Sequence, residues 1–169
     1  KELKEGNNVL DIGANIGYYV LFEKRIVGKG MVYAIEPEPN NYKHLKKNII
    51  LNNYKNIKTF NLAMSNKEGE SKLYLSSLSN VHTLISGDLD NKMTGKSINV
   101  KVTTPLDFIK KNKCKIHLIR MDLEGLEVKI IENIIKIIKQ GLSKPSILFE
   151  VHPNKYSNKN NLKKQIEKL

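Results

Sequence analysis

The stretch VLDIGANIG, residues 9–17, decides the fold of this 169-residue chain. It begins with a short apolar run, Val9 to Ile12, and then turns through Gly13 and Gly17. An apolar run that stops at glycines is typical of a buried strand. Glycine allows a ligand to approach the main chain closely, although a tight strand-to-helix turn would use the same residues. The stretch predicts a strand, a loop and a helix whose first amides are free to face a ligand.

Strands and helices are expected to alternate along most of the remaining sequence. Further strands are expected over residues 31–35, 57–62, 116–121 and 146–151, and helices over residues 15–27, 104–110, 124–139 and 160–169, with another helix capped by Asn40. The first helix is expected to bury one side that carries Ile16, Tyr19, Val20, Phe22 and Val27. This order predicts an α/β fold: a doubly wound, mostly parallel sheet with helices on both faces. Ligands of such sheets bind beyond the carboxyl ends of the strands.

The middle of the chain has a different pattern. Residues 71–75 and 98–102 alternate polar and apolar side chains, which predicts an antiparallel excursion. Residues 76–97 between them are expected to form a long polar loop, and its segment 79–83, which includes His82, is either a lid over the acceptor or a disordered polar loop.

Two acids near the glycine loop indicate what it binds. The Gly-x-x-x-Gly spacing of Gly13 and Gly17 departs from the dinucleotide fingerprint, which argues against a nicotinamide dehydrogenase. Asp11 lies two residues before Gly13, where a carboxylate suits a ligand with an ammonium group. Glu36 follows the second expected strand, 19 residues after Gly17, at the usual distance of an acid that accepts from ribose hydroxyls.

Segments in order along nearly the whole chain resemble the FkbM family of S-adenosylmethionine-dependent methyltransferases. Residues 9–17 look like motif I of the wider superfamily with the Rossmann-like fold, and Glu36 looks like its ribose-binding acid. The narrower match rests on GANIGYY (13–19), EPEP (36–39), AMSNKEG (63–69), TPLD (104–107), IRMDLEGLE (119–127) and EVHP (150–153). The Asp-x-Glu-Gly-x-Glu pattern in residues 122–127 is the most specific of these segments.

The resemblance implies a cofactor, S-adenosylmethionine, and O-methyl transfer to a hydroxyl of a sugar, glycan or secondary metabolite. The residues it implies for cofactor binding are Asp11, Gly13, Ala14, Asn15, Gly17, Glu36, Pro37, Asn61 and Ala63, the last two beside the adenine. The chain departs from the family at Arg120, where Lys is more frequent, and at Pro105. Neither departure is expected to touch the chemistry.

The acids and the histidine after the last two expected strands suit the transfer step. The resemblance makes these strands neighbours, so that Asp122, Glu124, Glu150 and His152 would face one cleft. An alcohol must lose its proton as it accepts the methyl group. Asp122 is the first candidate for the base or acceptor-orienting group and His152 the second, while Glu124 and Glu150 would hold acceptor hydroxyls or a cation.

Each of these residues also has a structural interpretation. Acids near the start of a helix favour its dipole, which would account for Glu124 and Glu127, and His152 before Pro153 would suit a turn. Magnesium could lie among the carboxylates, but nothing in their spacing demands a metal ion, and none is predicted.

The net charge of +12 raises nucleic acid as a partner, and with it an RNA methyltransferase as the alternative function. Only Arg25 and Arg120 are arginines, however, and the chain contains no Trp for a base-stacking platform. A small-molecule or glycan acceptor is therefore favoured. A non-catalytic cofactor-binding module is the remaining alternative, against which the retained Asp11, Glu36 and Asp122 argue.

The length predicts a single domain over residues 1–169. The superfamily sheet normally ends in an antiparallel strand pair after the strand that here ends near Glu150, and this pair is expected to be missing. The domain is therefore expected to be part of a longer protein, with an exposed sheet edge. No apolar run is long enough to span a membrane, and one cysteine, Cys114, allows no internal disulfide. A cytoplasmic protein is the expectation.

Overall fold

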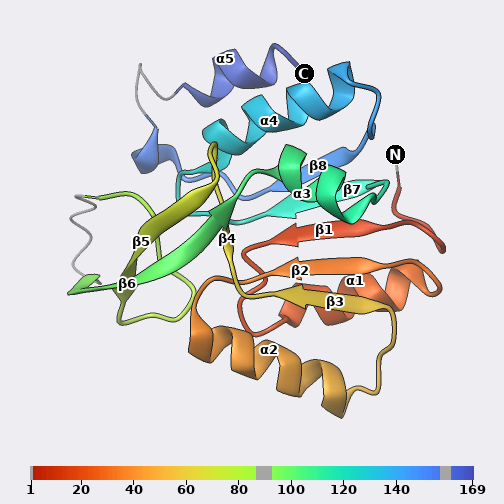
Figure 1. Ribbon diagram of the computed structural model, residues 1–169, viewed down its shortest axis with the longest axis horizontal. Coiled ribbons are helices and arrows are strands. Elements are labelled where there is room, and N and C mark those ends of the chain that lie inside the picture. The colour runs from red at the N-terminus through yellow and green to blue at the C-terminus, as the bar shows by residue number, and fades with distance from the viewer. Residues whose placement is uncertain (1, 87–92, 157–160) are drawn as a thin grey trace.

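The computed structural model describes residues 2–86, 93–156 and 161–169. Its main sheet has five parallel strands, which are β1 (Val9–Ile12), β2 (Val32–Ile35), β3 (Ile57–Phe60), β7 (Leu118–Met121) and β8 (Ser146–Phe149). The strand order is β3-β2-β1-β7-β8 (Figure 1). The chain therefore winds outward from β1 in one direction and then outward from β7 in the other. This confirms the doubly wound parallel sheet.

Two apolar clusters cover the two faces of this sheet. Side chains alternate across a strand, so that Val9 faces one cluster while Leu10 faces the other. The first cluster includes residues of α1 (Tyr18–Val27) and α2 (Pro39–Leu51). The second includes residues of α3 (Pro105–Asn112) and α4 (Glu127–Lys139), with Ile130, Ile131, Ile134 and Ile137 of α4 fully buried.

A second, smaller sheet lies beyond the carboxyl ends of the main strands (Figure 1). It consists of β4 (Ala63–Met64), β5 (Gly69–Ser76) and β6 (Met93–Thr103), in the order β4-β6-β5. β5 pairs with β6 in the antiparallel sense, as the alternating pattern predicts. The long loop predicted over 76–97 is too long, because β6 begins at Met93; residues 87–92 lie outside the described part of the chain.

Helix α1 differs from the prediction in the face that it buries. It begins at Tyr18, and Ile16, Tyr19 and Phe22 are exposed, whereas Glu23 and Lys24 are buried. Burial of Lys24 is tolerated because its ammonium group donates to the carbonyl oxygens of Gly28 and Gly30. The apolar count alone did not identify this face. Hydrogen bonds to carbonyl oxygens compensate the buried Lys24, whereas burial raises the pKa of Glu23 to about 9, so that its carboxyl group is protonated near neutral pH.

Two helix starts also differ from the predictions. Glu38, and not Asn40, caps α2, since its carboxylate accepts a hydrogen bond from the amide of Asn41 at 2.7 Å. Helix α4 begins at Glu127, and Glu124 lies before it in a turn with a left-handed φ of 51°. The helix dipole therefore does not account for Glu124.

The last segments are short. A 3-10 turn, Pro153–Lys155, follows β8, and α5 spans Leu162–Ile166 instead of residues 160–169. Strand β8 forms one edge of the sheet as described, and Leu148 on it is 56% exposed. Over the described residues, no helix is both long and apolar enough to cross a membrane.

Candidate functional site

The largest concentration of predicted site residues lies where the strand order reverses, at the carboxyl ends of β1, β2 and β7. A pocket of about 400 Å³ opens there. Its lining includes six residues that the sequence assigned to the cofactor or to catalysis: Gly13, Ala14, Asn15, Glu36, Pro37 and Asp122. Ala63, from the start of β4, also lines it. The topology therefore brings most of the predicted residues into one cavity of a size suited to a small ligand.

Gly13 joins the two halves of this pocket. Its φ of 85° is left-handed, and a Cβ atom there would lie 2.4 Å from the carbonyl oxygen of Asp122. Any side chain would therefore push the loop after β1 away from the end of β7. Gly17 is the N-cap of α1, packs against Leu45, and is not among the described residues that line the pocket.

Glu36 is 4% exposed and is held by two backbone amides. Its Oε1 accepts from the amide of Glu38, and its Oε2 accepts from the amide of Asn15, both at 2.8 Å. Burial raises the pKa of Glu36 to about 7, although these hydrogen bonds favour the ionised form. The carboxylate is thus fixed in position, and each oxygen keeps a lone pair for a further donor.

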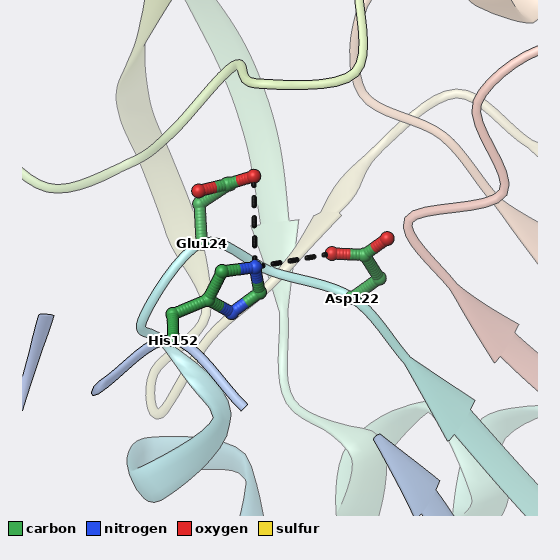
Figure 2. Close-up of side chains that lie close together, drawn as sticks. All are labelled: Asp122, Glu124 and His152. Carbon is green, nitrogen blue, oxygen red and sulfur yellow. Dashed lines mark ion pairs between the residues drawn. The ribbon is translucent and has the colours of Figure 1, made fainter. Parts of the chain in front are cut away.

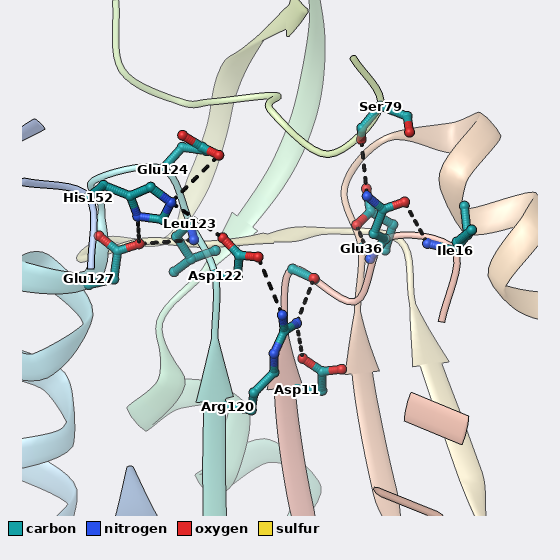
Figure 3. A network of polar contacts seen from close by, with 12 residues as sticks. Asp11, Ile16, Glu36, Ser79, Arg120, Asp122, Leu123, Glu124, Glu127 and His152 are labelled. Atoms are coloured by element: carbon teal, nitrogen blue, oxygen red, sulfur yellow. Dashed lines mark hydrogen bonds and ion pairs between the residues drawn. The ribbon is translucent and has the colours of Figure 1, made fainter. Parts of the chain in front are cut away.

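Asp11 does not occupy the position that the sequence suggested. It is completely buried, and it is not among the described residues that line the pocket. Arg120 shields it: the guanidinium donates to Asp11 Oδ1 at 3.0 Å, to the Gly13 carbonyl oxygen at 3.2 Å and to Asp122 Oδ2 at 3.3 Å (Figure 3). The guanidinium takes the place at Asp11 that a ligand's ammonium group was expected to take.

Sequence reasoning missed Arg120 as a functional residue. Arg120 lines the pocket, and its guanidinium carbon lies 4.1 Å from the centre of the Tyr19 ring. Desolvation alone would lower the pKa of Arg120, but the carboxylates of Asp11 and Asp122 raise it above its usual value. The clue in the sequence is the alternation of acid and base in Asp11, Arg120 and Asp122, which neighbouring parallel strands place side by side.

Asn61 and Ala63, the two residues predicted beside the adenine, have different positions relative to the pocket. Ala63 lines the pocket, as already noted, whereas Asn61 is not among its described lining residues. The Asn61 amide donates instead to the carbonyl oxygens of Glu36 and Pro37, at 2.9 and 3.0 Å. Asn61 therefore fixes the loop after β2 from the side of β3.

The segment after β5 closes over the glycine loop. The Ser79 carbonyl oxygen accepts from the side-chain amides of Asn15 at 3.3 Å and Asn41 at 2.8 Å. Ser79, Asn80, His82, Thr83 and Leu84 all line the pocket. The structure therefore places this segment as a cover over the pocket, beside Glu36 and the glycine loop.

On the β7–β8 side, Asp122, Glu124 and His152 come together (Figure 2). His152 Nε2 lies 3.7 Å from Asp122 Oδ1 and 3.6 Å from Glu124 Oε1. Burial raises the pKa of both Asp122 and Glu124 above the ordinary carboxyl value; Arg120 opposes the shift at Asp122, and His152 opposes it at Glu124. The cluster borders the pocket because Asp122 belongs to both.

Glu127 supports this cluster from behind. It is completely buried at the start of α4, and its Oε1 lies 3.3 Å from His152 Nδ1. The Leu123 amide donates to Oε1 and the Tyr156 hydroxyl donates to Oε2, both at 3.0 Å. Glu127 therefore has a positioning role that the helix dipole alone does not explain.

Glu150 departs from the prediction. It is exposed, and the described pocket lining does not include it. The chain turns after β8, so that His152 points toward Asp122 and Glu124 while Glu150 remains at the surface. Glu150 still raises the pKa of Asp122 through its charge.

Comparison with known proteins gives this geometry a context. The chain is 22% identical to Methyltransferase 1 of Beauveria bassiana (strain ARSEF 2860) over 143 residues, which are 75% of this chain and 57% of that protein. The chain thus spans less than two thirds of this relative's length.

Solved structures share the fold. A fibrillarin pre-rRNA processing protein of Methanococcus jannaschii has a TM-score of 0.55 at 19% identity, over 99% of this chain and 56% of that chain. A precorrin-6y C5,15-methyltransferase of Geobacter metallireducens GS-15 has a TM-score of 0.54 at 14% identity, over 98% and 62%. An Aeropyrum pernix fibrillarin with natively bound S-adenosyl-L-methionine has a TM-score of 0.52 at 12% identity, over 98% and 56%.

The family follows from a match over most of the sequence. The methyltransferase FkbM domain matches residues 11–169, which include the glycine loop, Glu36, and the whole Asp122–His152 cluster. This family uses S-adenosylmethionine as its cofactor, and the pocket lies at the switch point of the parallel sheet, where ligands of such sheets bind. The chain belongs to the FkbM family of S-adenosylmethionine-dependent methyltransferases.

Proposed function

We propose that the chain transfers the methyl group of S-adenosylmethionine to a hydroxyl oxygen of a sugar, a glycan or a secondary metabolite. The observation that carries the proposal is the position of Asp122, whose carboxylate lines the cofactor pocket and also borders His152 and Glu124. A single carboxylate thereby joins the space for the cofactor to a polar cluster suited to a hydroxyl group. Three acidic or imidazole groups would recognise hydroxyls better than an apolar acceptor.

In this proposal the cofactor lies along the glycine loop. Glu36 accepts hydrogen bonds from the ribose hydroxyls, while Gly13, Ala14 and Asn15 supply the backbone floor. Pro37 and Ala63 border the adenine. Arg120 is the group of suitable charge for the carboxylate of the methionine part, and Asp11 acts through Arg120, since burial keeps Asp11 away from the pocket.

The transfer itself needs little from the protein beyond position and a proton acceptor. The acceptor oxygen attacks the methyl carbon in line with the sulfur, so that an O–C bond forms as the S–C bond breaks. The sulfonium becomes the neutral thioether of S-adenosylhomocysteine. The hydroxyl proton passes to Asp122, with His152 beside it as the next group in line.

An assay with labelled methyl donor tests the acceptor class. The purified chain is incubated with S-adenosylmethionine carrying a labelled methyl group and with size-fractionated cell extract, and labelled products are identified by mass spectrometry. Methyl ethers in the glycan or metabolite fractions are expected. Label confined to the RNA fraction would replace the proposal with the RNA methyltransferase alternative, and absence of label with intact cofactor binding would favour a non-catalytic module.

The role of Asp122 is tested on the same assay. Asp122→Asn is expected to keep the affinity for S-adenosylmethionine while turnover falls by roughly 10²–10⁴-fold, the usual contribution of a positioned proton acceptor. Glu70→Gln is the control, because Glu70 is exposed on β5, outside the pocket lining. Parallel loss of cofactor affinity and turnover would place Asp122 in the cofactor site instead.

A further inference from the structure

The cluster of Asp122, Glu124 and His152 has distances that hydrogen bonding does not explain. Its two imidazole–carboxylate contacts are 3.6 and 3.7 Å long, whereas hydrogen bonds between such atoms measure about 2.7–3.2 Å. All three ligand atoms nevertheless lie within 4.8 Å of one another. Groups that converge without bonding to each other leave space for something between them.

The spacing matches that of atoms that share one metal ion. Nitrogen and oxygen ligands lie about 2.0–2.2 Å from an ion such as zinc, so two ligands of the same ion are about 3–4 Å apart. In Figure 2 the imidazole Nε2 is the atom directed toward both carboxylates. The three side chains come from the loops after β7 and β8 and offer one nitrogen and two oxygens on one side of a common point.

Neighbouring side chains hold Asp122 and His152 in orientations that suit metal binding. Asp122 Oδ2 accepts a hydrogen bond from Arg120 at 3.3 Å, which leaves Oδ1 free to face the cluster. Behind His152, the buried carboxylate of Glu127 faces Nδ1 at 3.3 Å and is itself held by the Leu123 amide and the Tyr156 hydroxyl. Carboxylates that accept a hydrogen bond from the second ring nitrogen orient metal-bound histidines and fix their tautomer. Glu127 is placed to do so, although Nδ1 makes no hydrogen bond within the described part of this structure.

The charges also favour a cation. Three carboxylates, those of Asp122, Glu124 and Glu127, surround one imidazole. Arg120 offsets part of this charge next to Asp122 but is shared with Asp11, and Lys155 offsets part of it next to Glu124. A divalent ion would neutralise the remaining negative charge where the three ligand atoms meet.

We infer that Asp122, Glu124 and His152 form a binding site for one divalent first-row transition metal ion at the edge of the cofactor pocket. One imidazole and two carboxylates favour Mn²⁺, Fe²⁺ or Zn²⁺ over Mg²⁺, which prefers oxygen ligands and water. Where the proposed function also holds, the ion would bind the acceptor hydroxyl as a Lewis acid and ease loss of its proton to water, since both oxygens of Asp122 would then be engaged.

Manganese binding by the purified full chain tests the inference without acceptor or methyl transfer. After removal of metal ions with chelator, the chain is titrated with Mn²⁺, and the free ion is followed by electron paramagnetic resonance. We expect one bound Mn²⁺ per chain, displaced by Zn²⁺ but not by an equal concentration of Mg²⁺. Absence of saturable binding of Mn²⁺ and Zn²⁺ would overturn the site, and equal displacement by Mg²⁺ would remove His152 from the ligand set.

Variants locate the ion. His152→Ala and Glu124→Gln are expected to abolish Mn²⁺ binding, and Glu127→Gln is expected to weaken it by about 10–100-fold, as for other residues that orient a ligand. Glu70→Gln, at an exposed position near the start of β5, is expected to bind Mn²⁺ like the parent chain. Unchanged binding in the His152 and Glu124 variants would overturn the inference.

A second readout separates folding and function from metal binding. Affinity for S-adenosylmethionine, measured by calorimetry, should remain near the parent value in the Glu124→Gln and His152→Ala variants, because neither residue lines the described pocket. Metal binding with no methylation of hydroxyls would leave the inference standing and reject the proposed function. Hydroxyl methylation by a chain that binds neither Mn²⁺ nor Zn²⁺ would do the reverse.

Discussion

The β1–β2 side of the pocket and its β7–β8 side hold their charged groups in different ways. On the β1–β2 side, Glu36 accepts two backbone amides at 2.8 Å, and Asp11 is paired with Arg120 at 3.0 Å. On the β7–β8 side, the imidazole of His152 stands 3.3–3.7 Å from three carboxylates, and its Nδ1 has no hydrogen-bond partner. On the first side Glu36 and Asp11 each accept hydrogen bonds from within the chain, although Asp11 Oδ2 has no partner among the described residues. On the second side the imidazole and the carboxylates face one another without hydrogen bonds between them, so that a proton or a cation from outside would stabilise them.

Under the proposed function the two sides have different tasks. Groups that are already paired keep a fixed shape, which suits a cofactor that every reaction cycle uses in the same way. Groups that repel one another in partial burial gain stability from whatever neutralises them. Arg120 and Gly13 connect the sides, and three measurements test how far the contrast between them holds.

The largest effect is expected from Arg120→Met, which would leave Asp11 buried without its counter-charge. Breaking a buried ion pair from one side costs about 3–5 kcal/mol, so the free energy of unfolding should fall by that amount in urea titrations. Arg25→Met is the matched control, since Arg25 is exposed on α1 and is the other arginine of the chain.

The double variant Asp11→Asn, Arg120→Met decides the cause. If the loss comes from an unpaired charge, the double variant should recover most of the stability. A double variant as unstable as Arg120→Met would mean that packing of the guanidinium against Tyr19 matters more than the ion pair.

An intermediate effect is expected from Gly13→Ala, which forces the two sides of the pocket apart. The new Cβ would lie 2.4 Å from the Asp122 carbonyl oxygen at a φ of 85°. A residue held in such a region costs about 1–3 kcal/mol, and the clash adds to this cost. We expect a lower unfolding free energy in urea titrations and a large loss of affinity for S-adenosylmethionine by calorimetry.

Gly6→Ala separates the two causes. Gly6 has nearly the same φ, 82°, but a Cβ atom there would meet nothing within 4 Å. Only the conformational cost, about 1–2 kcal/mol, should appear, with cofactor affinity unchanged. Equal effects of the two variants would show that contact between the β1 loop and the β7 end is not what Gly13 protects.

The smallest effect is expected from pH, through Glu36. With the pKa of Glu36 raised by burial from 4.5 to about 7, the folded chain keeps a proton that the unfolded chain releases between these values. The contribution of Glu36 to stability therefore falls as pH rises through this window. Cofactor affinity should move the opposite way, because ribose hydroxyls need the ionised carboxylate as acceptor.

Calorimetry at pH 6, 7 and 8 measures the effect. Ionisation of a group with a pKa near 7 changes by about tenfold over this range, so affinity should rise by up to about tenfold. The Glu36→Gln variant is the control. Its affinity changes with pH only through other groups, such as the cofactor's own amino group, and this change is subtracted from that of the parent chain. Parallel profiles for the parent and this variant would exclude Glu36 as the ribose acceptor.

The sequence predicted much of the β1–β2 side because its residues are close in the chain. The run Val9–Ile12, the glycines after it and the acid after the next strand are separated by short, regular intervals. Strand pairing then places Ile12 beside Ile35, so that Glu36 follows directly at the pocket. Local pattern and tertiary contact agree here, and five of the predicted residues line the same cavity from this side: Gly13, Ala14, Asn15, Glu36 and Pro37.

The structure places Asp11 and Glu150 outside the described pocket lining, and the local sequence could not indicate this. Both are acids at strand ends, and nothing in the local sequence distinguishes a buried acid from an exposed one. Asp11 is paired across the sheet with a residue 109 positions away, and Glu150 remains at the surface because the chain turns before His152. Side-chain direction at a strand end depends on the neighbouring strand, which the local sequence does not contain.

The sequence by itself determined the doubly wound sheet, the glycine loop and the methyltransferase family, because strand–helix periodicity and short motifs are local properties. Only the tertiary structure decided that Arg120 covers Asp11, that Glu127 stands behind His152, and that His152 points at Asp122 and Glu124. These contacts join segments that the sheet alone brings together. Their strength depends on burial and distance, and both quantities arise only when the chain has folded.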